Sequence, residues 1–303
     1  MSATTDLDVR GCWPALSLDG WRDTYETLHR WTQIVGKVRL ALTPRVNHWW
    51  NVALYVDARG LTTSPIPWQE RTFEVRFDFR QHELVLHLSD GDTRAMPLAP
   101  RSVADFYAAF MDLLHACGID VEIWTTPVEI PDPIPFERDH GHASYDRESV
   151  ERFFRILVTV DRIFRVFRAG FVGKCSPVHF FWGSFDLAVT RFSGQRAPPR
   201  EGADAVMREA YSHEASSVGF WPGGSGVSGA AFYAYFAPEP AGFSTAKVSP
   251  DAAYYDRQLG EFLLMYDALR EAPSPSAALL EFCTSSYDAG ARLAHWDRSA
   301  LER

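Results

Sequence analysis

The chain has 303 residues, of which 46% are hydrophobic, 14% aromatic and 23% charged. This length and balance are typical of a globular protein with a large core, and they exclude disordered and fibrous classes. The 39 acidic and 30 basic side chains give a net charge of -9, which argues against nucleic acid or an anionic membrane as a partner. A small-molecule ligand is therefore expected, and no oligomeric state is predicted.

The cysteines and the first residues indicate the cellular compartment. The four cysteines are widely spaced and form no CxxC pair, so they are interpreted as free thiols in a reducing environment. The start of the chain lacks the basic and apolar regions of a signal peptide, and no apolar run approaches the length of a membrane helix. A cytoplasmic location is predicted.

The first half of the chain is predicted as a helix, a group of strands and a second helix. Helical spacing of apolar residues predicts a helix over 21–33, with Gly36 as its stop. Alternation with a period of two predicts strands over 48–56, 73–80 and 83–88, which would form an antiparallel meander with one solvated face. A capping-box-like start at Ser102 predicts a helix ending at Gly118. A strand over 121–125 would close this half.

The second half follows a connector with four prolines between 127 and 135, which can hold neither a helix interior nor a central strand. An amphipathic pattern predicts a helix over 149–168. Further elements are predicted as strands over 179–189 and 231–236 and helices over 251–270 and 276–293.

These elements predict an α+β fold of two weakly related halves, each an antiparallel meander flanked by helices, packed as one unit. The halves would span 1–130 and 149–303, joined by a proline-rich connector over 131–148. The relation rests on an internal repeat: a helix, Val-Gly-Lys and a histidine that enters a strand occur in both halves. Such halves could enclose a cleft for a small molecule.

Basic residues take matching places in the two halves. Only three of the 30 basic residues are lysines, and Lys37 and Lys174 both belong to the repeat. A lysine there could act as a base, a Schiff-base former or an anion clamp, or could simply meet the last carbonyls of a helix. We predict both as catalytic residues that hold an anionic group of the substrate. Arg59 and Arg191 end the matching strands and are predicted to contact it.

Three histidines and an acid form the candidate centre. His48 and His179 share predicted strand faces with apolar residues, so both side chains should point inward, and His213 precedes Glu214 in a polar turn. These four residues match the ligand set of a zinc site or of an iron site with open positions, although no HExxH or HxxxH spacing supports it. The alternative is acid–base catalysis by His48 and His179, or buried histidines that only make hydrogen bonds.

Weaker alternatives involve other pairs. His140 and His142 could grip a metal together. Ser184 and Asp186 with His179 suggest a hydrolase triad, but the GxSxG elbow is missing. Cys175 beside Lys174 could be an activated nucleophile.

Two further features concern the whole chain. Aromatic residues gather beside the histidines, and Trp50, Phe181 and Trp182 are predicted to line a pocket for a flat or apolar ligand. The runs GKCSPVHFFWGSFDLAVTRFSG from Gly173 and WTQIVGK from Trp31 resemble the family called domain of unknown function 5996. The resemblance covers nearly the whole chain and implies a single full-length architecture, but it brings no activity.

The leading functional prediction is an enzyme with an interior histidine and carboxylate site, with or without a divalent metal, that acts on a small anionic or aromatic molecule. The alternatives are a non-catalytic binding protein with the same aromatic pocket, and a structural or assembly module. A catalytic site would need at least two of the named polar groups to converge.

Overall fold

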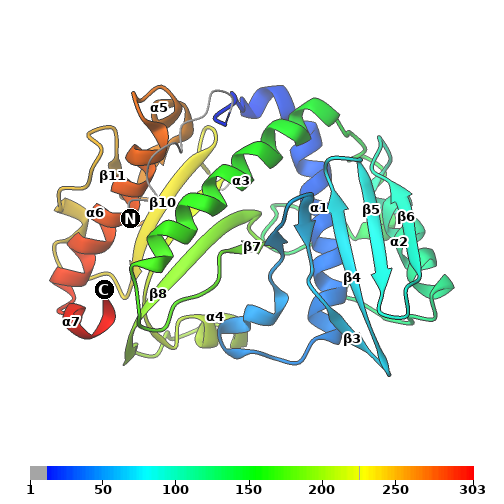
Figure 1. Ribbon diagram of the computed structural model, residues 1–303, viewed down its shortest axis with the longest axis horizontal. Coiled ribbons are helices and arrows are strands. Elements are labelled where there is room, and N and C mark those ends of the chain that lie inside the picture. The colour runs from blue at the N-terminus through cyan, green and yellow to red at the C-terminus, as the bar shows by residue number, and fades with distance from the viewer. Residues whose placement is uncertain (1–11, 225) are drawn as a thin grey trace.

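The computed structural model describes residues 12–224 and 226–303 and confirms the α+β class (Figure 1). Its strands form two antiparallel six-stranded sheets. The α-helices are α1 (Leu18–Leu42), α2 (Val103–Ala116), α3 (Arg147–Ala169), α4 (Ala205–Ala210), α5 (Tyr266–Arg270), α6 (Pro275–Leu293) and α7 (Arg298–Leu301). Short 3-10 helices are η1 (Asn47–Val52), η2 (Phe136–Arg138) and η3 (Phe243–Thr245). No helix in the described ranges combines the length and apolar character needed to cross a membrane.

The first sheet lies in the N-terminal part of the chain. It consists of β1 (Tyr55–Val56), β2 (Gly60–Thr62), β3 (Ile66–Trp68), β4 (Arg71–Asp78), β5 (Glu83–Leu88) and β6 (Thr93–Pro97). The order is β1-β2-β4-β5-β6, and β3 pairs with β4. Phe73, Val75 and Phe77 alternate along β4 and are buried, as their period of two predicts. Trp31 of α1 stacks on Phe106 of α2 with ring centroids 4.5 Å apart, which joins the two helices of this layer.

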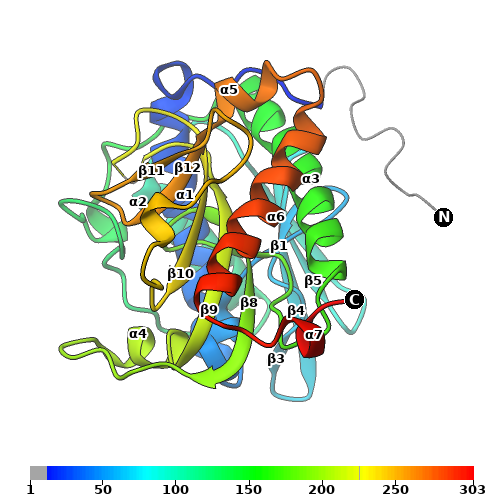
Figure 2. The same ribbon diagram turned by 90° about the vertical axis from the view of Figure 1, so that its left-hand side faces the viewer.

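The second sheet has the order β11-β12-β10-β9-β8-β7. Its strands are β7 (His179–Phe181), β8 (Asp186–Arg196), β9 (His213–Trp221), β10 (Ala231–Ala237), β11 (Tyr254–Asp256) and β12 (Glu261–Met265). Helices α3 and α6 contact each other and cover one face of this sheet (Figure 2). The other face of this sheet is not covered by these two helices.

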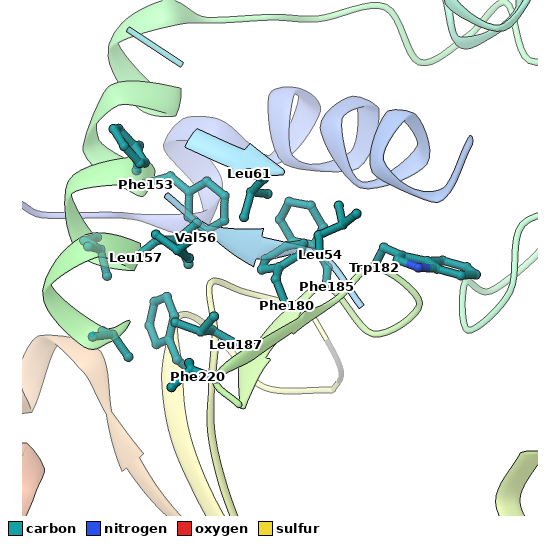
Figure 3. Packing of buried hydrophobic residues seen from close by; sticks show 14 of the residues in the cluster. Leu54, Val56, Leu61, Phe153, Leu157, Phe180, Trp182, Phe185, Leu187 and Phe220 are labelled. Atoms are coloured by element: carbon teal, nitrogen blue, oxygen red, sulfur yellow. The ribbon is translucent and has the colours of Figure 1, made fainter. Parts of the chain in front are cut away.

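The two sheets meet at Leu54 and Phe180. These residues exchange two backbone hydrogen bonds, of 2.9 and 2.8 Å, and both side chains are fully buried. Phe153 of α3 lies among the same residues, so helix and both sheets share one core (Figure 3). At Gly36 of α1 an added Cβ would lie 2.3 Å from the Trp182 ring. Glycine at this position therefore permits close packing, and α1 continues past it to Leu42, beyond the predicted stop.

Several predicted elements are confirmed. Helices near 102–118, 149–168 and 276–293 form, as do strands near 73–80, 83–88 and 231–236. Ser102 caps α2 by accepting a hydrogen bond from the Asp105 backbone N–H, as its capping motif predicts. The segment 121–125 forms no strand. The relation between the two halves stays a prediction.

Two predicted strands are wrong in their extent. The segment 48–56 contains η1, because His48 and Trp49 take left-handed backbone angles with φ of 58° and 59°, and only Tyr55–Val56 is a strand. The segment 179–189 is a hairpin, because the chain turns at Phe185, whose φ is also 58°. The parity argument that placed His48 and His179 on equivalent strand faces therefore fails.

The predicted helix over 251–270 is also wrong. Strands β11 and β12 lie within it, and only its last residues, in α5, are helical. Leu263 pairs with Tyr233 of β10 and with Tyr254 of β11, so pairing with distant strands decides the conformation of an ambiguous apolar run.

Candidate functional site

A cavity of about 690 Å³ lies against the face of the second sheet that α3 and α6 do not cover. The sheet provides its floor, and η1, α4, the 182–184 turn and residues 128 and 129, at the start of the proline-rich run 127–135 that leads into the connector, provide its walls. Its main polar and aromatic lining residues are His48, Trp49, Trp50, Glu129, Phe181, Trp182, Ser184, Asp186, Tyr211, Ser217, Trp221, Tyr233, Tyr235 and Glu261. The cavity therefore draws on both halves of the chain.

Strand register explains why space is left above the floor. Ala188, Gly219 and Tyr233 stand opposite one another on β8, β9 and β10, so their side chains share one face. A Cβ added at Gly219 would lie 2.2 Å from the Tyr233 ring, so the end of the Tyr233 side chain occupies the space next to the glycine. Ser217 and Ala188, both small, leave the volume above them open.

Two carboxyl groups face this cavity from different strands. Asp186 begins β8, is almost completely buried, and accepts hydrogen bonds from the hydroxyls of Ser184 and Tyr233. Burial raises its pKa to about 6. Glu261 begins β12, and its Oε2 is buried without a hydrogen-bond partner among the described residues. Burial and the nearby Asp186 raise the pKa of Glu261 to about 7.

A third carboxyl group, Glu129, comes from the connector. Gln33 of α1 holds the connector in place, because its side-chain amide accepts from the Val128 N–H at 2.9 Å and donates to the Val128 carbonyl at 2.8 Å. Glu129 then lies against Gly183, where an added Cβ would be 2.5 Å from its Oε1. Burial and Asp186 raise the pKa of Glu129 as well. The proline-rich connector thus contributes a wall of the site.

His48 lines the cavity near a small basic cluster. Its Nδ1 lies 3.1 Å from the carbonyl oxygens of Glu209 and Ala210, so this nitrogen carries the proton and donates. Its Nε2 therefore accepts from the Lys174 ammonium, 2.7 Å away. Burial, Lys174 and His213 lower the pKa of His48, so the imidazole is neutral. The His213 ring centroid lies 5.7 Å from that of His48.

His179 has a different environment and does not line the cavity. It is fully buried among Trp50, Tyr55 and Phe181, with ring centroids 5.3 to 5.7 Å away. Neither ring nitrogen has a hydrogen-bond partner among the described residues. Burial lowers its pKa to about 3, with a contribution from the positive charges of Arg39 and Arg168. Trp50 lies between His179 and His48, so the two imidazoles do not converge on a common space.

The predicted metal ligands His48, His179, His213 and Glu214 do not assemble. Glu214 accepts a hydrogen bond from Ser193 at 2.8 Å, and His179 is enclosed by aromatic rings. Within residues 12–224 and 226–303, no group of three histidine, cysteine or acidic side chains is arranged to hold a metal ion. His48 and His179 instead both pack against Trp50, whose ring centroid lies 5.4 Å from that of His48 and 5.7 Å from that of His179.

The other predicted basic residues have internal partners. The Lys37 ammonium donates to the Thr126 carbonyl at 2.7 Å, and burial lowers its pKa to about 8. Arg59 forms an ion pair with Asp78. The Arg191 guanidinium lies 3.5 Å from the Phe167 ring centroid. None of the three lines the cavity, whereas the predicted contact residues Trp50, Phe181 and Trp182 do.

The weaker alternatives also lack the necessary contacts. Ser184 donates to Asp186, but His179 bonds neither. Burial raises the pKa of Cys175 to about 11, so its thiol is protonated at neutral pH. His142 contacts the carboxylates of Asp139 and Glu26 rather than forming a metal pair with His140.

Sequence reasoning missed Glu129, Glu261 and the tyrosines of β10, and it named Asp186 only as a member of a triad. A signal was available for Asp186 and Glu261, because each acid immediately precedes an apolar strand-like run. No signal in the sequence places Glu129 near them, since that contact depends on Gln33.

No curated protein and no solved structure matches the chain. A family profile matches residues 13–303, which is nearly the whole length and includes every residue of the cavity. The chain therefore belongs to DUF5996, a family of unknown function.

Proposed function

We propose that the protein is an enzyme that binds a small flat or apolar molecule in the cavity and transfers a proton with the carboxyl group of Glu261. One observation carries this proposal: two carboxyl groups from different strands, Asp186 and Glu261, face the same aromatic-lined cavity. Buried carboxyl groups that lack a counterion are costly for folding, so they are concentrated at sites where they serve chemistry. We also infer a cytoplasmic location, which the free cysteines support.

The two carboxyl groups have different roles in this proposal. Both oxygens of Asp186 accept hydrogen bonds from hydroxyls, so Asp186 is fixed and acts as a positioning residue. Glu261 also lines the cavity, and its buried Oε2 has no hydrogen-bond partner among the described residues. The Asp186 charge contributes to the raised Glu261 pKa of about 7, which suits a group that gives a proton in one step and takes one in another near neutral pH.

The predicted histidines have supporting roles. His48 is neutral and both of its nitrogens are engaged, one by backbone carbonyls and one by Lys174. It therefore shapes the far end of the cavity together with Trp50 rather than exchanging protons. His179 contributes packing beneath Trp50.

Binding is tested with matched variants. Ala188→Leu extends a cavity-floor side chain into the open volume, and Ala95→Leu makes the same change at an exposed residue of β6. Ligand-observed NMR with indole, phenol, 2-phenylethylamine and benzoate should detect binding to the wild type and to Ala95→Leu. Ala188→Leu should weaken it at least about tenfold, which corresponds to about 1.4 kcal/mol. Equal binding by Ala188→Leu would contradict a ligand site in this cavity.

Catalysis is tested by mass spectrometry of a small-molecule library incubated with the protein. The proposal expects a product with the wild type and at least about a hundredfold slower formation with Glu261→Gln, the range for loss of a general acid or base. Equal conversion by both proteins would contradict the role of Glu261. Binding of library members without any conversion would instead support a non-catalytic binding protein.

A further inference from the structure

We infer that the ligand of this cavity is an organic cation, a molecule that carries a protonated or alkylated amine on an apolar body. This inference rests on the proposed function, because it assigns a substrate class to the same cavity. Its starting point is the charge of the lining: Glu129, Asp186, Asp204 and Glu261 are acidic, and no lysine or arginine lines the cavity among the described residues. This inference differs from the sequence-based prediction of a small anionic or aromatic molecule in the charge it assigns to the ligand.

The other buried aspartates of the chain have arginine partners, and Asp186 in the cavity differs from them in this respect. Asp78 pairs with Arg59, Asp139 with Arg30 and Asp161 with Arg165. Asp186 is equally buried, yet no ion pair to it is formed within residues 12–224 and 226–303. The other buried aspartates each pair with an arginine, whereas Asp186 accepts hydrogen bonds from two hydroxyl groups. The positive charge that would pair with Asp186 can therefore come from the ligand.

The charge of Asp186 also acts on the two glutamates of the cavity, Glu129 and Glu261, in addition to the effect of their burial. Asp186 contributes to the raised pKa of both Glu129 and Glu261, and Asp256 adds to the effect on Glu261. A cation between them would offset the effect of this charge and favour the ionised forms. The tyrosines that line the cavity, Tyr211, Tyr233 and Tyr235, are protonated, because burial raises the pKa of all three and brings those of Tyr233 and Tyr235 well above 10. They can donate hydrogen bonds but supply no positive charge.

Aromatic rings surround the carboxyl groups. Trp221 and Tyr233 have centroids 4.3 Å apart, and Tyr233 and Tyr235 are stacked at 6.0 Å. The Tyr211 hydroxyl lies 3.0 Å from that of Tyr235, but one face of the Tyr211 ring is occupied by the Arg200 guanidinium, 3.9 Å from the ring centroid. Aromatic faces attract ammonium groups through the ring quadrupole, and they do so most strongly when water is excluded. Carboxylates combined with several aromatic faces therefore suit an organic ammonium group.

A metal cation does not fit this arrangement as well. No three acidic or histidine side chains in the described part of the chain are arranged as a metal-ligand group. A diffuse cation with an apolar body matches separated carboxyl groups and a mainly apolar wall better than a compact ion does.

The opposite end of the cavity indicates the orientation. Lys174 is held by His48 at 2.7 Å and lies 5.3 Å from the ring centroids of Trp50 and Phe192. The protein's own cation thus lies beside the His48 end, where it would repel an ammonium group. We expect the amine to lie near Glu261 and the apolar body to extend toward Trp50.

The test uses three probes with one ring and different charge: 2-phenylethylamine, 2-phenylethanol and phenylacetate. Titration calorimetry at pH 8 with the wild type should give at least about tenfold tighter binding for the amine than for the alcohol, and the weakest binding for the acid. This preference should shrink at pH 5, where Glu261 is protonated, since its pKa is about 7.

Variants of the carboxyl groups test whether these groups cause the preference for the amine over the alcohol. Glu261→Gln keeps the side-chain shape and should reduce the preference for the amine at least about threefold, while the alcohol binds as before. Glu129→Gln provides a second test if Glu261→Gln fails to fold, and Glu83→Gln, at an exposed strand end, should change nothing. Equal or tighter binding of the alcohol or the acid would overturn the cation inference while leaving the cavity as a binding site. Failure of all three probes to bind would contradict both proposals.

Discussion

Charged side chains have different surroundings on the two sheets of this protein. On the first sheet, Arg76 of β4 forms ion pairs with Asp57 at 2.6 Å and with Glu74 at 2.8 Å, on a partly solvated face. On the second sheet, Asp186 and Glu261 occupy a covered face and have no such basic partner among the described residues. Charged residues on a strand can therefore face water and form ion pairs, as on the first sheet, or be enclosed without a basic partner, as on the second.

The covering elements decide between these outcomes. Both sheets bury one face against helices, but the second face of the β7–β12 sheet is enclosed by η1, α4 and the connector. Charges on a solvated face are stabilised by water and by each other, whereas enclosed carboxyl groups lose hydration, which raises their pKa until a counterion favours the ionised form. This difference shows that enclosed carboxyl groups without a basic partner are a feature by which a ligand site can be recognised.

The largest effect is expected where the two sheets join. Phe180→Ala removes a fully buried ring between Leu54 and Phe153, and should lower the free energy of unfolding by about 3–5 kcal/mol. Because both sheets share this core, thermal unfolding followed by circular dichroism and by tryptophan fluorescence should shift together as one transition. Val172→Ala, at an exposed position, should cost less than about 0.5 kcal/mol. Separate transitions for the two signals would show that the sheets unfold independently.

A smaller effect is expected at His179, which is buried and whose ring nitrogens have no hydrogen-bond partner in the described part of the chain. Its pKa is about 3 in the fold and near 6.5 in the unfolded chain, so only the unfolded chain gains a proton between these values. Stability should therefore fall as pH decreases below 6.5. His179→Leu should remove about 2–3 kcal/mol of this loss at pH 4, while at pH 8 the change stays within about 1.5 kcal/mol.

Urea titrations of both proteins at pH 4 and pH 8 measure this difference. His29 is a useful comparison, because burial lowers its pKa to about 4 although its Nε2 lies 2.8 Å from the Gly183 carbonyl. Its contribution to acid sensitivity should persist in His179→Leu. Identical pH dependence in the wild type and the variant would show that His179 has solvent access.

Local sequence patterns predicted the elements whose conformation is decided locally. The helix at 147–169 and the strand at 83–88 follow from uninterrupted periodicity, and Ser102 caps its helix through a hydrogen bond three residues away. The turn at His48 was not predictable in this way. It requires left-handed angles in two bulky residues, which only the surrounding contacts can enforce.

The site was less predictable than the fold because it depends on contacts between distant residues. Trp50 and Trp182 do line the cavity, and their contact with a ligand stays a prediction that rests on the aromatic residues gathered near the histidines. Glu261 was hidden in a segment predicted as a helix, and its strand exists only through pairing with β10. Histidines attracted attention because of their chemistry, yet burial makes His179 an apolar packing residue.

The smallest expected effect on stability is that of replacing one glutamate on each sheet, Glu261 and Glu74. Glu261 has a pKa of about 7 in the fold against an ordinary value of 4.5, so the fold retains a proton that the unfolded chain loses. Stability should therefore fall as pH rises from 4.5 through 7, and Glu261→Gln should recover about 1–2 kcal/mol at pH 8 and little at pH 5. Glu74→Gln should instead cost about 0.5–1 kcal/mol at pH 8, because Glu74 accepts from Arg76 and Thr62. Urea titrations at both pH values should thus give opposite signs for the two variants, and a loss of stability in Glu261→Gln at pH 8 would mean that the protein itself supplies a counterion to this carboxylate.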